Sequence, residues 1–124
     1  MKDLIYSHEA YEIIGKCMEV HSELGHGFLE IVYKDALEKV FAEDGIFFER
    51  EKKYIVEFRN EVLKHFFYAD FVILDKIILE VKCVSYVTDE HIAQCINYLK
   101  VSDNRLALLV NFGRGKLEYK RIVY

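Results

Sequence analysis

The stretch ILEVKCV at residues 78–84 is a short apolar run that carries a glutamate and a lysine two residues apart. Side chains in a strand alternate between its two faces, so Glu80 and Lys82 point to one side and their apolar neighbours to the other. Charged residues are rarely buried without partners. A solvated ion pair on an edge strand would explain the pattern, as would protection of an edge against aggregation or a functional site.

The bulk composition limits the classes of protein that need to be considered. The chain has 124 residues, which predicts a single domain over residues 1–124, and 52% of them are hydrophobic, which excludes disorder. Apolar runs are too short to span a bilayer, and the N-terminal residues lack the apolar core of a signal peptide, so we expect a cytoplasmic protein without membrane contacts. Three cysteines at unrelated spacings indicate reduced thiols. A net charge of −4 argues against a broad basic surface but permits an acidic site that recruits cations.

Hydrophobic periodicity predicts two helices, a group of strands, a third helix and two final strands. The helices are expected at about 7–24, capped by Ser7, at 29–43, and from Thr88 to near Val101. The strands are expected at 54–59 and 62–68 around a tight turn at Asn60-Glu61, at 70–74 and 77–84, and at 105–112 and 116–124. This order predicts an α/β protein with a mixed β-sheet flanked by helices.

A hairpin over residues 70–84 would bring Asp70 to Glu80 and Lys82. A two-residue loop would place Asp70 opposite Val81 and on the wrong face, so the site requires a loop of odd length, most simply three residues, or a bulge. Two carboxylates that close repel each other unless a cation lies between them, and Mg²⁺ prefers such oxygen ligands.

Two helices contribute further candidates. Glu30 lies on the apolar stripe of the second helix, where it could join a metal site or only favour the helix dipole. In the third helix, Gln94 and Tyr98 flank the core stripe. They could face Lys82, or Tyr98 could only pack while Gln94 remains at the surface.

These residues resemble the PD-(D/E)xK nuclease superfamily. Asp70 followed by Glu80-Val81-Lys82 is similar to its D…(D/E)xK signature, with Ala69 in place of the proline. Residues 94–98, QCINY, resemble the QxxxY element of its RecB-type branch, and residues 27–33, GFLEIVY, match the motif of the GxxExxY proteins. The resemblance extends over nearly the whole chain and implies a restriction-endonuclease-like core.

The resemblance also implies metal-assisted hydrolysis of phosphodiester bonds in nucleic acid, with DNA favoured over RNA. It implies Mg²⁺ or Mn²⁺ held by Asp70, Glu80, the backbone carbonyl of Val81 and Glu30. Lys82 would position the attacking water or stabilise charge on the phosphate, aided by Gln94 and Tyr98. Without a metal, water or the Lys82 ammonium is expected beside the carboxylates. Two alternatives remain open: a catalytically silent module that binds nucleic acid or protein, and a purely structural salt-bridge network.

Overall fold

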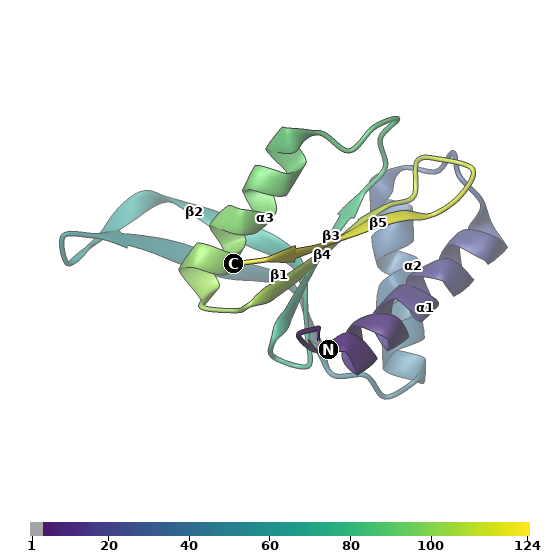
Figure 1. Ribbon diagram of the computed structural model, residues 1–124, viewed down its shortest axis with the longest axis horizontal. Helices are drawn as coiled ribbons and strands as arrows, with labels where there is room; N and C mark the ends of the chain where they lie inside the picture. The colour runs from purple at the N-terminus through teal and green to yellow at the C-terminus, as the bar shows by residue number, and fades with distance from the viewer. Residues whose placement is uncertain (1–3) are drawn as a thin grey trace.

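The computed structural model describes residues 4–124 as a central mixed sheet with helices on both faces (Figure 1). The elements are α1 (Ser7–Leu24), α2 (Glu30–Glu43), β1 (Phe48–Phe58), β2 (Glu61–Ile73), β3 (Ile77–Lys82), α3 (Asp89–Ser102), β4 (Leu106–Asn111) and β5 (Glu118–Val123). The predicted arrangement, a mixed sheet flanked by helices, is confirmed. In the described part of the chain, no helix combines the length and the apolar character needed to cross a membrane.

The sheet has the order β1-β2-β3-β4-β5, in which only β3 and β4 are parallel. The crossover between these two strands contains α3, as a parallel connection requires. Both strands are buried almost throughout, which explains why they read as nearly continuous apolar runs. The ILEVKCV stretch therefore lies in the middle of the sheet, and the edge-strand explanation for Glu80 and Lys82 is wrong.

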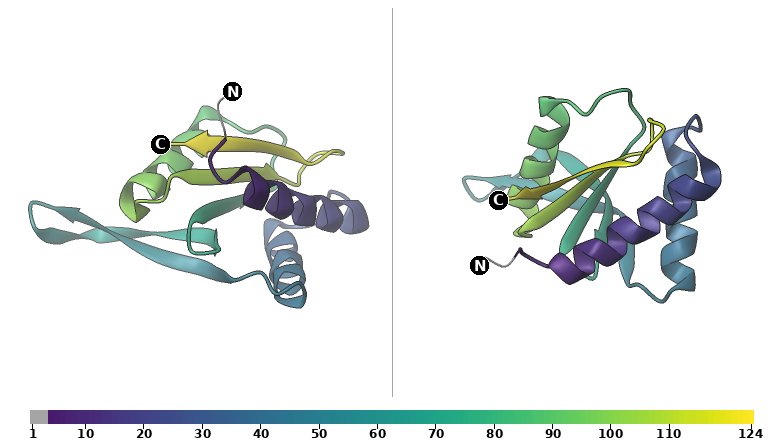
Figure 2. Two further views of the ribbon diagram at one scale, coloured as in Figure 1. Left: turned by 60° about the horizontal axis from the view of Figure 1, so that its bottom comes forward. Right: turned by 45° about the vertical axis from the view of Figure 1, so that its right-hand side comes forward.

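Each face of the sheet has its own core. Ile77, Leu79 and Val81 pack against α1 and α2, whereas Ile78 packs against α3. By strand alternation, Glu80 and Lys82 share the α3 face with Ile78. Figure 2 shows the same layering, with α1 and α2 on one side of the sheet and α3 on the other.

Several predicted boundaries need correction. The first helix begins at Ser7 itself with Tyr6 at the N-cap position, so Ser7 does not cap it. The predicted strands 62–68 and 70–74 form the single strand β2. The tight turn lies at Arg59-Asn60, one residue earlier than predicted, and both residues have positive φ, as a type I′ turn needs. Strand β1 begins at Phe48, six residues before the predicted strand 54–59, because its first half is rich in charged residues and shows no clear alternation of apolar side chains.

Near Asp70, the side chains of the β1–β2 hairpin switch from one face of the sheet to the other. Phe71 packs beneath α1 and α2, while Ala69 packs beneath α3, although residues two apart in a regular strand share one face. The pairs Arg50–Phe71 and Lys52–Ala69 leave Glu51 opposite Asp70, and Glu51 has a φ of 54°. A left-handed residue in one strand thus accompanies the change of face in both strands.

Candidate active site

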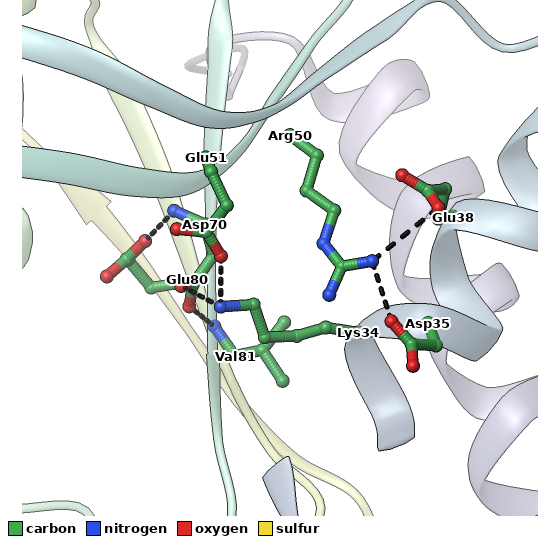
Figure 3. A network of polar contacts seen from close by, with 8 residues as sticks. All are labelled: Lys34, Asp35, Glu38, Arg50, Glu51, Asp70, Glu80 and Val81. Carbon is green, nitrogen blue, oxygen red and sulfur yellow. Dashed lines mark hydrogen bonds and ion pairs between the residues drawn. The ribbon is translucent and has the colours of Figure 1, made fainter. Parts of the chain in front are cut away.

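Two buried carboxylates interlock strands β2 and β3. The pair Ile73–Ile77 encloses a three-residue loop, so the predicted odd loop length is confirmed and the register places Asp70 opposite Glu80. The Asp70 N–H donates to Glu80 Oε2 at 2.7 Å, and the Val81 N–H donates to Asp70 Oδ2 at 2.8 Å (Figure 3). Each carboxylate therefore accepts a backbone N–H of the neighbouring strand, which fixes its orientation.

The burial of this pair disfavours a second negative charge beside Asp70. Asp70 is 8% exposed and Glu80 is 2% exposed. Burial, reinforced by the negative charge of Asp70, raises the pKa of Glu80 to about 8. A nearby positive charge therefore favours the ionised form of Glu80.

Lys34 supplies a positive charge at this place. Its ammonium, which extends from α2, donates to Asp70 Oδ1 at 2.8 Å and pairs with Glu51 (Figure 3). Burial alone would lower the pKa of Lys34, but the hydrogen bonds to Asp70 and Glu51 outweigh it and the pKa is raised. The expectation that the Lys82 ammonium would take this position is wrong, because Lys34 holds it.

Lys82 points instead toward α3. Its Nζ donates to Gln94 Oε1 at 3.1 Å, so the expected contact between these two side chains is present. Thr88 caps the helix, accepting the His91 N–H at 3.4 Å, while His91 Nδ1 accepts the Thr88 N–H at 3.0 Å. This cap sets the start of α3. It therefore also sets the position of Gln94 along the helix, where it contacts Lys82.

Tyr98 lies one turn further along α3 and is buried in the core beneath it. Its ring contacts Phe67 edge to face with centroids 5.6 Å apart. Burial first, and then the charge of Glu80, raise the pKa of Tyr98, so its hydroxyl stays neutral. Packing is the role that this environment shows for Tyr98.

Glu30 approaches the carboxylates without joining them. It is the first residue of α2 and is partly exposed, and burial and the charge of Asp70 raise its pKa. Among residues 4–124, however, no three His, Cys, Asp or Glu side chains lie close enough to hold a metal ion together. The predicted convergence of Glu30 with Asp70 and Glu80 is therefore not seen.

The GFLEIVY segment forms a clasp that positions α2. Gly27 has a φ of 115°, which a residue with a Cβ rarely adopts. The Tyr33 hydroxyl donates to the Gly25 carbonyl at 2.7 Å and accepts the Phe28 N–H at 3.3 Å. The glycine and the tyrosine of the motif thus shape the turn from which Glu30 and Lys34 extend.

Sequence reasoning missed three residues of this region. Lys34 left a signal, because it is four residues after Glu30 and so lies on the same helix face. Glu51 left none, since its left-handed conformation cannot be read from a run of charged residues. Asn111 is also fully buried: its amide accepts the Val84 N–H and donates to the Val84 carbonyl, each at 2.9 Å, and so holds the chain just after Lys82.

The site thus combines an acidic pair interlocked across two strands with a lysine two residues after the second acid, oriented by a helix. A family model described as the PD-(D/E)XK nuclease superfamily matches residues 7–122, and the chain belongs to this superfamily. The fold is similar to the crystal structure of SSO0001, with a TM-score of 0.64 and 20% sequence identity over 95% of this chain. The match covers 59% of that longer chain. No significantly similar curated protein was found.

Members of this superfamily are generally hydrolytic nucleases and typically use divalent metals. The residues present fit one such ion. Mg²⁺ is commonly bound through only one or two carboxylates, with water and substrate phosphate completing its coordination, so Asp70 and Glu80 suffice without a third carboxylate. The Lys34 ammonium already acts as a stand-in cation against Asp70.

Proposed function

We propose that this protein is a Mg²⁺- or Mn²⁺-dependent nuclease that hydrolyses phosphodiester bonds of DNA. The observation that carries the proposal is the interlocked pair of Asp70 and Glu80, with Lys82 two residues after Glu80 in β3. Superfamily membership supports the reaction class, and the GFLEIVY motif supports a place in the GxxExxY group.

Asp70 and Glu80 would hold the ion, with the Val81 carbonyl beside them and Glu30 acting through a bound water. The ion would polarise the scissile phosphate and lower the pKa of the attacking water. The burial of both carboxylates keeps bulk water away from their charges, which strengthens their attraction for a cation.

Lys82 would stabilise the negative charge that develops on the phosphate. Its hydrogen bond to Gln94 fixes the direction of the ammonium before substrate arrives, so little reorganisation is needed in the transition state. Tyr98 would contribute by packing α3 against the sheet, which keeps Gln94 in position to contact Lys82.

One observation favours a second candidate, a catalytically silent module that binds nucleic acid or protein. The Lys34 ammonium already neutralises Asp70, so the site is compensated without a metal ion. In that case the charged residues would serve stability, and metal would have no role.

The deciding experiment compares cleavage by the wild type and by Lys82→Ala on labelled single-stranded and duplex DNA and RNA with Mg²⁺ or Mn²⁺. We expect metal-dependent cleavage of DNA by the wild type and a loss of at least about a hundredfold in the variant, with unchanged melting. Lys39→Ala, an exposed lysine of α2, is the matched control and should cleave normally. Absence of metal-dependent cleavage by the wild type on every substrate would refute the nuclease and leave the silent module.

A further inference from the structure

The β1–β2 hairpin extends well beyond the rest of the sheet and past α3 (Figures 1 and 2). Its outer part, residues 52–68, contains four lysines and arginines against two glutamates, whereas the whole chain has a net charge of −4. The projecting arm is therefore locally cationic on an acidic protein. Such a charge asymmetry attracts a polyanion to the arm and not to the body.

One face of this arm is packed and the other is open. Tyr54 and Phe67 turn toward the core beneath α3. The opposite face is built from the neighbouring pairs Lys53–Tyr68 and Ile55–Phe66. We call these four residues, Lys53, Ile55, Phe66 and Tyr68, the hairpin platform. Phe66 is 44% exposed and Tyr68 is 48% exposed, so large aromatic surfaces face solvent.

The side chains of the platform hold one another in place. The rings of Phe66 and Tyr68 meet edge to face with centroids 5.5 Å apart, and Lys53 Nζ lies 4.1 Å from the centroid of Phe66. Exposed aromatic rings combined with basic groups are what proteins use to bind single-stranded nucleic acid, because every unpaired base offers a face for stacking. In a regular duplex those faces are covered by neighbouring bases.

The platform leads directly to the candidate active site. Tyr68 and Phe66 precede Asp70 by two and four residues in β2, which corresponds to about 7 and 13 Å along a strand. Lys53 likewise follows Glu51, the residue that shares Lys34 with Asp70, by two residues. A nucleotide held on Tyr68 would therefore place an adjoining phosphate near Asp70, where the strand changes face.

We propose that the hairpin platform binds unpaired nucleotides, and that the substrate class is single-stranded nucleic acid or a duplex with a single-stranded end. Tyr68 provides the stacking surface, Phe66 supports the ring of Tyr68 and the Lys53 stem, and the Lys53 ammonium contacts a backbone phosphate. This inference rests on the proposed nuclease function for its position beside the site, but its binding step is independent of cleavage.

Fluorescence anisotropy of the full chain in EDTA tests the proposal without cleavage. The probes are a labelled thymidine homopolymer and a fully paired hairpin duplex of the same length. We expect the wild type to prefer the single strand, and Tyr68→Ala and Phe66→Ala each to weaken that binding about tenfold, the scale of one lost base-stacking contact. Lys53→Ala should reduce the salt dependence by about one phosphate contact, a slope change of about 0.7.

Two controls separate stacking from general damage. Tyr68→Phe keeps the ring and should bind as the wild type does. Tyr11→Ala removes a ring from α1 that is more exposed than Tyr68, and it should have no effect. Equal binding by the wild type, Tyr68→Ala and Phe66→Ala, or no single-strand binding by the wild type, would overturn the proposal. So would sedimentation showing a dimer that Tyr68→Ala dissociates, because a second copy would then cover the platform.

The two proposals fail in different ways. Single-strand binding that depends on Tyr68, without any cleavage in Mg²⁺ or Mn²⁺, would support the binding role of the hairpin platform and refute the proposed nuclease activity. Cleavage that depends on Lys82, with binding that is unchanged in Tyr68→Ala and Phe66→Ala, would support the nuclease activity and refute the binding role of the hairpin platform.

Discussion

Lys34 shows how one side chain changes the electrostatics of an acidic site. Its ammonium is nearly buried between Asp70 and Glu51, where a metal ion would also be attracted. Removing one partner of a buried ion pair is strongly destabilising because it leaves the other charge uncompensated. Lys34 therefore stabilises the metal-free protein and competes with an ion for Asp70.

Lys34→Ala tests both parts of this statement. In EDTA we expect the free energy of unfolding to fall by about 3–5 kcal/mol, because the Asp70 carboxylate stays buried without its cation. Saturating Mn²⁺ should stabilise Lys34→Ala more than the wild type, since the ion no longer competes with the ammonium. Urea denaturation in EDTA and in Mn²⁺ measures both effects.

The control for this variant is Lys39→Ala, which removes an exposed lysine from the same helix and should change stability little. Equal stabilisation of Lys34→Ala and the wild type by Mn²⁺ would show that Lys34 and the ion do not share a site.

At the scale of elements, the turn between α1 and α2 determines where the site residues of α2 lie. The hydroxyl of Tyr33 closes this turn, and its ring stacks on Phe112 with centroids 4.6 Å apart, which ties the turn to the end of β4. Arg50 of β1 adds a second anchor through its 2.7 Å contact with Asp35. The placement of Glu30 and Lys34 is therefore a property of the whole helix and its clasp.

Gly27→Ala should loosen this clasp. An alanine at a φ of 115° is strained, so we expect a loss of about 1–3 kcal/mol in the free energy of unfolding, accompanied by weaker cleavage. Gly15→Ala is the matched control: it lies inside α1 with open space around its Cβ position, and the change should stabilise by about 0.5–1 kcal/mol. Chemical denaturation of both variants measures the two changes in the free energy of unfolding, which should have opposite signs. A stabilising Gly27→Ala would contradict the role of Gly27 in the clasp.

At the scale of the whole molecule, the site lies where the parallel pair β3–β4 meets the β2–β3 hairpin and α3. Lys82 pairs with Asn111 at the ends of these two strands. Gly113 then approaches the chain after β3 so closely that an added Cβ would lie 2.4 Å from the Val84 carbonyl oxygen. Long-range contacts from β4 thus fix the end of β3 that presents Lys82.

Asn111→Ala should release this end of the strand. The backbone N–H and carbonyl of Val84 would lose their partners, which predicts a loss of about 1–3 kcal/mol in stability. Cleavage should fall by more than the loss of folded protein explains, because Lys82 is no longer held. Asn111→Asp keeps the acceptor for the Val84 N–H but sets a buried carboxylate oxygen against the Val84 carbonyl and Glu118, so it should destabilise at least as much as Asn111→Ala. Full activity of a folded Asn111→Ala would show that this anchor does not position Lys82.

The sequence alone determined the features that depend on local periodicity. Strand alternation placed Glu80 and Lys82 on one face, and the same parity required the odd loop that puts Asp70 opposite Glu80. Helical spacing placed Gln94 beside the core stripe, from which it could face Lys82 or stay at the surface, and the structure shows the contact with Lys82. These inferences succeed because side-chain direction within a strand or helix follows from residue spacing.

The tertiary structure decided what spacing cannot encode. Glu51 takes a left-handed conformation within β1, and the change of face at Asp70 accompanies it. Lys34 instead of Lys82 reaches Asp70, since the clasp and the packing of α2 set the direction of its side chain. Glu30 stays outside the acidic pair for the same reason. Which charged groups meet in a buried site depends on how separate elements pack, and that packing is fixed only when the whole chain has folded.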